Sequence, residues 1–215
     1  MNLIVIACSI MKEELTHVSH DGVSFVFLEQ SLHRTPQKMK DAIQAEIDKA
    51  GDRPVVLGYG LCSNGLLGIR AGKNRVAVPK AHDCITFFLG SRARYMEEHN
   101  REPGTYYLTR GWIDERKSPL GILDEYCRKY GKETAEWAIR EELKNYTRIA
   151  LVESELGVSE SHRSHAEENA RFLNLRYEEL RGSLDFFRKI VESRWDDDFI
   201  ILNPGEELTQ DKFFE

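Results

Sequence analysis

Three cysteines and one histidine in the first half of the chain are the side chains best suited to chemistry: Cys8, Cys62, His82 and Cys84. His82 and Cys84 stand two residues apart, so both side chains can turn toward one cation. A histidine with three cysteines suits tetrahedral zinc, and iron or an iron–sulfur cluster is the alternative occupant. We predict that these four residues bind a metal ion. The structural alternative is that the cysteines are small buried core residues.

The elements that would position these residues follow from the hydrophobic pattern. Short β-rich runs alternate with helical stretches, which predicts an α/β fold with a Rossmann-like, mostly parallel sheet and helices on both faces. Each of the three cysteines closely follows a predicted strand. The carboxyl ends of neighbouring parallel strands open into one crevice, so this fold would bring the three sulfurs together. The predicted strands cover residues 3–7, 24–28, 55–59, 75–78, 105–108, 149–152, 174–177 and 199–202.

Helical periodicity is clearest in residues 36–50, where Met39, Ile43 and Ile47 repeat every four positions. Residues 120–146 carry a long amphipathic pattern that predicts one helix. A further pair of helices is predicted over residues 164–172 and 183–191.

A charged stretch at residues 114–119, which ends in Ser118-Pro119, is the best candidate boundary within the chain. It would divide a site-bearing α/β lobe, residues 1–115, from a second α/β lobe, residues 116–215. One continuous domain is the alternative.

Helix starts next to the cysteines predict that their sulfurs are deprotonated. Ser9 is a good helix N-cap residue directly after Cys8, and Asp83 can cap a helix that begins near Ile85. The partial positive charge at a helix N-terminus favours a thiolate over a thiol. We therefore expect the fold to concentrate thiolates in one cleft.

Two further residues are candidates for catalysis. His33 follows the second predicted strand and could act at the same cleft as an acid, base or ligand, with a structural role at a helix entry as the alternative. Arg110 could hold an anionic substrate. Trp112 could form a pocket wall or belong to the core, whereas Cys127, in the middle of a predicted helix, is expected to be a core residue.

The glycine-rich segment 58–65 places Gly60, Asn64 and Gly65 where a strand gives way to a helix. Glycine permits tight turns and lets a ligand approach backbone N–H groups, so these three residues are candidate contacts for an anionic cofactor or substrate. The segment has neither the dinucleotide fingerprint nor a phosphate-loop ending, and nucleotide binding is therefore weakly supported.

Composition narrows the class of protein. The chain has 215 residues, of which 41% are hydrophobic, and this is enough for a substantial core. A net charge of -6 with interspersed acids and bases argues against nucleic-acid binding. No apolar run approaches the roughly 20 residues that span a bilayer, and the opening segment does not read as a signal peptide. We expect a cytoplasmic protein, in which reduced cysteines are ligands, nucleophiles or core residues.

Four blocks of sequence resemble a prokaryotic domain family of unknown function that is found mainly in anaerobes and is often encoded near corrinoid-dependent methyltransferases. The resemblance covers most of the chain. The chain departs from the family pattern at two positions: it has Ser63 where glycine is expected and Lys80 where arginine is expected. Neither change removes a predicted ligand. The four blocks are residues 32–36, 58–65, 79–84 and 104–112.

The resemblance implies an association with methyl-group or one-carbon metabolism. Corrinoid systems use zinc to activate a thiol acceptor, and His82-Asp83-Cys84 is similar to a short ligand element of such methyltransferases. Those enzymes are barrels, however, and the pattern of elements here is different.

Three functions follow from these features. The first is a zinc or iron protein that activates a small thiol or handles methyl groups, with a corrinoid protein or a methyltransferase as a possible partner. The second is an accessory protein that delivers metal to, or docks on, a methyltransferase without catalysis. The third is a metal-free enzyme in which Cys62 or Cys84 is the nucleophile and His82 or His33 is the base.

Overall fold

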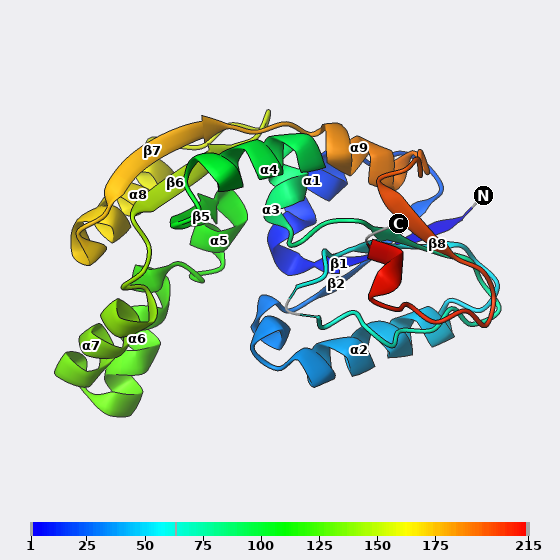
Figure 1. Ribbon diagram of the computed structural model, residues 1–215, viewed down its shortest axis with the longest axis horizontal. Coiled ribbons are helices and arrows are strands. Elements are labelled where there is room, and N and C mark those ends of the chain that lie inside the picture. The colour runs from blue at the N-terminus through cyan, green and yellow to red at the C-terminus, as the bar shows by residue number, and fades with distance from the viewer. Residues whose placement is uncertain (1, 63, 214–215) are drawn as a thin grey trace. The chain divides into compact units, whose positions relative to one another are not determined.

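The computed structural model describes residues 2–62 and 64–213. The chain forms two compact units (Figure 1). The first unit contains the residues up to Arg92 together with those from Leu184 onward, and the second unit contains Ala93–Ser183.

The first unit is built on a five-stranded sheet with the order β2-β1-β3-β4-β8. All neighbouring strands are parallel except β8, which runs antiparallel to β4. Every residue of β1, β3 and β4 is buried, as expected of central parallel strands covered on both faces. The strands are β1 (Leu3–Cys8), β2 (Val23–Leu28), β3 (Val55–Gly58), β4 (Val76–Pro79) and β8 (Phe199–Leu202).

Helices cover both faces of this sheet (Figure 1). On one face lies α2 (Pro36–Lys49), which buries Met39, Ile43 and Ile47 as its four-residue spacing predicts. On the other face, the tilted rings of Phe87 and Phe186 pack together, with their centroids 5.0 Å apart. The helices of that face are α1 (Lys12–His17), α3 (Ile85–Leu89) and α9 (Asp185–Val191). Short 3-10 helices are η1 (Ser9–Met11), η2 (Gln30–Arg34) and η3 (Asp211–Phe213).

The second unit has a three-stranded parallel sheet, β5-β6-β7. Its core contains Leu108, Ile149 and Leu151, on which Ala166 and Ala170 of α8 pack. The strands are β5 (Thr105–Thr109), β6 (Arg148–Glu153) and β7 (Arg176–Arg181). The helices are α4 (Arg92–Arg101, of which Arg92 belongs to the first unit), α5 (Arg110–Asp114), α6 (Pro119–Tyr130), α7 (Lys132–Glu142) and α8 (Glu160–Leu173).

A network of buried charged side chains lies at the amino-terminal end of this smaller sheet. The Arg148 side chain is fully buried and donates to Glu178 at 2.6 Å and to Thr105 at 2.7 Å. Glu98, also buried, accepts from Arg101 at 2.8 Å and pairs with Arg148 at 3.3 Å. These pairings give each buried charge a partner, so the network has a structural explanation.

The predicted fold class is confirmed, and all eight predicted strands are present. Two local predictions are wrong. Residues 120–146 form two helices, because Gly131, at φ +81°, interrupts the pattern between α6 and α7. Ser9 does not cap a helix that follows it, because it is itself the first residue of η1.

The predicted lobe boundary at residues 115–116 falls within the second unit, between α5 and α6. The pairing of β8 with β4 returns the end of the chain to the first sheet. Among the described residues, no helix is both long and apolar enough to cross a membrane.

Candidate functional site

The predicted cysteines lie at the carboxyl ends of three neighbouring strands. Cys8 is the last residue of β1, and Cys62 and Cys84 lie in the segments that follow β3 and β4. Because β3 lies between β1 and β4 in the sheet, the strands direct all three segments to the same edge. All three cysteines are buried, and no disulfide joins the four cysteines, all of which lie in the described residues.

Backbone hydrogen bonds join the segments that carry Cys62 and Cys84. Leu61 N donates to Ala81 O at 2.8 Å, and Cys62 N donates to His82 O at 3.0 Å. Gly60 permits this approach, because a Cβ atom at its position would lie 2.7 Å from the backbone N of Asp83. Cys62 has φ +44°, a left-handed conformation that is uncommon for a residue with a side chain.

The ionisation of the cysteines differs from the prediction. Burial raises the pKa of Cys62, and the negative charges of Asp83 and Cys8 raise it further. Burial likewise raises the pKa of Cys84 well above its usual value, with added effects of Cys62, Asp83 and Cys8. For Cys62 and Cys84, desolvation and like charges therefore favour the thiol over the expected thiolate and outweigh the effect of the nearby helix start.

Asp83 does stabilise the start of α3, as predicted. Its Oδ1 accepts a hydrogen bond from Ile85 N at 2.9 Å. In the arrangement described for residues 2–62 and 64–213, no group of three or more His, Cys, Asp or Glu side chains could hold a metal ion directly. Metal binding by the cysteines would thus require both loss of their protons and reorientation of side chains.

Tyr59 is a residue of this site that the sequence analysis did not single out. Its side chain is 1% exposed, and its hydroxyl has no hydrogen-bond partner among the residues that the structure describes. Burial raises the pKa of the phenol, and the charges of all three cysteines raise it further. A tyrosine between Gly58 and Gly60, three positions before the predicted ligand Cys62, was the available signal in the sequence.

The two predicted histidines occupy different environments. His33 lies in η2, and its ring centroid is 5.8 Å from that of Tyr59. Its Nε2 atom is buried, with no hydrogen-bond partner within the described part of the chain, and burial lowers the pKa of the imidazole. His82 is exposed, and its backbone carbonyl is the group that binds the Cys62 segment. The roles of His33 in catalysis and of His82 as a ligand stay predictions.

The remaining glycine-segment residues have backbone roles. Asn64 is exposed at φ +64°, and its carbonyl accepts from Leu67 N at 3.1 Å. A Cβ atom at Gly65 would overlap Met39 of α2, so helix packing accounts for this glycine. Ser63, which lies in the same segment, is outside the described residues. Cofactor binding by Gly60, Asn64 and Gly65 stays a prediction.

Arg110 and Trp112 belong to the second unit. Arg110 is the first residue of α5 and forms an ion pair of 3.5 Å with Asp114. Trp112 packs against the core of the small sheet. Cys127 is half-buried in α6. Anion binding by Arg110 stays a prediction, whereas packing accounts for Trp112.

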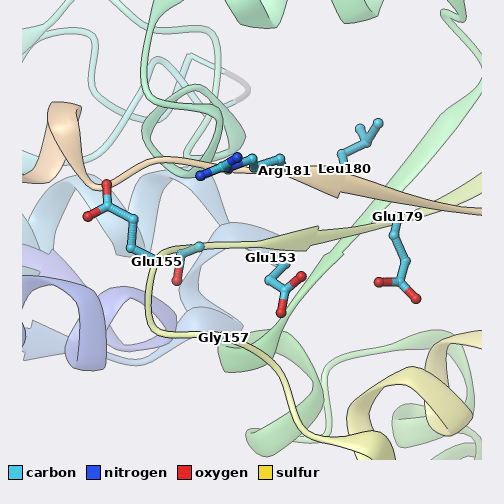
Figure 2. A pocket seen from close by; sticks show the side chains of 8 residues that line it. Glu153, Glu155, Gly157, Glu179, Leu180 and Arg181 are labelled. Atoms are coloured by element: carbon cyan, nitrogen blue, oxygen red, sulfur yellow. The ribbon is translucent and has the colours of Figure 1, made fainter.

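A cavity of about 520 Å³ lies within the second unit, at the carboxyl ends of β6 and β7. Figure 2 shows the carboxylates of Glu153 and Glu179 extending to the same side of these strands. Arg163 binds both of them, at 3.0 and 3.1 Å, so one of their two negative charges is compensated. The cavity contains none of the residues predicted from the sequence. Its lining residues are Glu153, Ser154, Glu155, Gly157, Glu179, Leu180, Arg181 and Gly182.

The model of a family described as "Protein of unknown function (DUF1638)" matches residues 27–191. This range contains His33, Tyr59, Cys62 and Cys84, whereas Cys8 precedes it. No curated protein and no solved structure matches the chain.

Proposed function

Because the chain belongs to the DUF1638 family, whose function is unknown, we propose a function from its cysteine site. The protein binds a metal ion through Cys8, Cys62 and Cys84, with zinc as the first expectation and iron or an iron–sulfur cluster as the alternative. The observation that carries this proposal is that three buried cysteines lie at the carboxyl ends of three neighbouring strands, where backbone hydrogen bonds join the segments of Cys62 and Cys84.

The electrostatics favour a cation over bare thiolates. Buried thiolates near one another, and near Asp83, repel each other in a medium that solvates them poorly. A divalent ion would reduce both the repulsion between the thiolates and the cost of burying their charge, because it replaces the protons and compensates the charge of the sulfurs. A metal-free cysteine nucleophile is less favoured, since the raised pKa of Cys62 and Cys84 keeps these thiols protonated.

The fourth coordination position decides between a closed and an open site. The exposed His82 would have to turn inward to complete a closed site of one histidine and three cysteines. If His82 stays outside, the position is open to a small thiol. The metal would then lower the pKa of that thiol and hold the thiolate ready for alkyl transfer.

We place this chemistry in the cytoplasm and in methyl-group metabolism. The support for this context is the sequence resemblance to proteins that are found in anaerobes and encoded near corrinoid-dependent methyltransferases. A corrinoid protein or a methyltransferase is accordingly the proposed macromolecular partner, and a small thiol is the proposed substrate.

The test is elemental analysis of protein purified without oxygen. We expect about one metal site per chain in the wild type and in Cys127→Ser, which changes the half-buried thiol of α6. Cys62→Ser and Cys84→Ser should lose most of the metal, because each removes a soft ligand. Full metal retention in both site variants would contradict the proposal.

A further inference from the structure

The cavity of the second unit takes no part in the proposed function. Its volume of about 520 Å³ falls within the range of small-molecule sites. It lies at the carboxyl ends of β6 and β7, which is where open parallel sheets bind their ligands. The loop that leads from β6 to α8 forms another part of its wall, through Ser154, Glu155 and Gly157. The position and the size of the cavity thus favour a site for a small molecule.

Glu153 brings a carboxylate oxygen without an internal partner to this cavity. Its Oε1 atom accepts from Arg163 at 3.0 Å and from Val158 N at 3.3 Å, whereas its Oε2 atom accepts no hydrogen bond within the described part of the chain. Glu179 uses both of its oxygens, which accept from Arg163 at 3.1 Å and from Tyr177 at 3.0 Å. Because one guanidinium serves two carboxylates, one negative charge remains for a ligand cation.

Arg181 brings the opposite charge to the same end of the sheet. It is the last residue of β7 and pairs in register with Glu153, the last residue of β6. Its side chain is exposed and lies along the end of β7, as Figure 2 shows. The guanidinium forms no ion pair or hydrogen bond with the other described residues. A carboxylate is a group that arginine binds well, through two parallel hydrogen bonds.

The two unpaired groups select a ligand that carries both signs of charge. A simple anion would meet Arg181, but the remaining negative charge of the glutamates would repel it. A simple cation would satisfy the glutamates and leave Arg181 unpaired. A molecule with one ammonium and one carboxylate pairs with both groups. Neighbouring parallel strands lie about 4.8 Å apart, so only a few bonds need to separate the two charged groups of the ligand.

We propose that this cavity binds a small amino acid, with its ammonium at Glu153 and its carboxylate at Arg181. None of the cysteines takes part, so the inference does not rest on the proposed function. Gly157 and Gly182 line the cavity with backbone alone, which leaves room for the other atoms of the ligand.

The experiment is ligand-observed NMR on the full chain. The standard L-amino acids, β-alanine and γ-aminobutyrate are tested one at a time by saturation-transfer difference, and the Kd of each binder is measured by calorimetry. We expect at least one of these compounds to bind. Its amide, which lacks the negative charge, and its N-acetyl derivative, which lacks the positive charge, should each bind about tenfold more weakly or not at all. Absence of binding by every compound, or equal affinity of either derivative, would overturn the inference.

Arg181→Gln is the most informative variant, because it breaks no contact with another described residue. It should keep the melting temperature of the wild type and bind the amino acid about tenfold more weakly. Glu153→Gln should weaken binding to a similar extent, and its melting temperature is measured alongside because it also loses the ion pair with Arg163. The controls, Arg171→Gln in α8 and Glu133→Gln in α7, change exposed charges and should bind normally. Wild-type affinity in Arg181→Gln would overturn the inference.

Discussion

Gly60 makes the cysteine site possible at the scale of a single residue. The segment from Ala81 to Asp83 passes so close to Gly60 that there is no space for a side chain. This approach allows Cys62 N to donate to His82 O, which holds the segments of Cys62 and Cys84 together. The sequence predicted that a ligand approaches Gly60; in the structure the nearest atoms belong to the protein's own backbone, and ligand binding at Gly60 stays a prediction.

Gly60→Ala should therefore destabilise the first unit. The new methyl group would lie 2.7 Å from the Asp83 backbone and 2.9 Å from Ala81 O, and backbone atoms cannot move aside as a flexible side chain can. We expect a loss of about 2–3 kcal/mol in the free energy of unfolding, measured by urea denaturation. Gly72→Ala is the control, because its nearest contact would be an ordinary 3.7 Å. Equal stability of the two variants would contradict the packing argument.

The positions of the three cysteines at or after strand ends were predictable at this scale, and the directions of the pKa shifts of Cys62 and Cys84 were not. Strand ends are visible in the sequence as apolar runs followed by turn residues, which is how Cys8, Cys62 and Cys84 were selected. Their pKa values depend on how deeply each sulfur is buried and which charges lie near it, and both quantities arise only in the folded chain. The buried hydroxyl of Tyr59 was missed for the same reason, since its lack of a partner among the described residues cannot be recognised without its surroundings.

At the scale of elements, α6 and α8 are joined by polar side chains. Ser118 caps α6 by accepting from Gly121 N at 3.0 Å, and its Oγ also shares a hydrogen bond of 2.8 Å with His165 Nε2 of α8. Asn169 of α8 accepts from Leu120 N at 2.9 Å. A sequence-based prediction finds Ser-Pro as a helix start, but it cannot find these cross-helix partners, which lie more than 40 residues away.

The His165 contact predicts a pH dependence of stability. Burial lowers the pKa of His165 below its usual 6.5, with a smaller contribution from the charge of His162 and an opposing one from Glu168. As the pH falls through 6.5, the unfolded chain binds a proton before the folded chain does, so the folded state loses stability. Urea unfolding at about pH 7.5 and about pH 5.5 should show this loss.

His165→Gln should reduce that pH dependence, because glutamine keeps a polar group near Ser118 and does not titrate. His33 contributes in the same direction, since burial also lowers its pKa, and some dependence should therefore remain. His99→Gln, at an exposed position of α4, serves as the comparison. An unchanged pH profile in His165→Gln would contradict this account.

At the scale of the whole molecule, the alternation of strands and helices predicted the fold class. It did not predict which strands belong to the five-stranded sheet and which to the three-stranded sheet. The last strand, β8, pairs with β4 although its first residue, Phe199, comes 120 positions after Pro79, the last residue of β4. Pairing between strands so far apart in the chain depends on which edge of the sheet is free and apolar. A local hydrophobic pattern does not contain this information. Gly131 was similarly overlooked, because one glycine in a long amphipathic pattern does not by itself reveal a turn.

The central claim is that three distant cysteines bind one metal ion, and X-ray absorption at the metal edge tests it most directly. In protein purified without oxygen, the account predicts three sulfur neighbours at about 2.3 Å from the metal. A first coordination shell that contains only nitrogen and oxygen would contradict the claim.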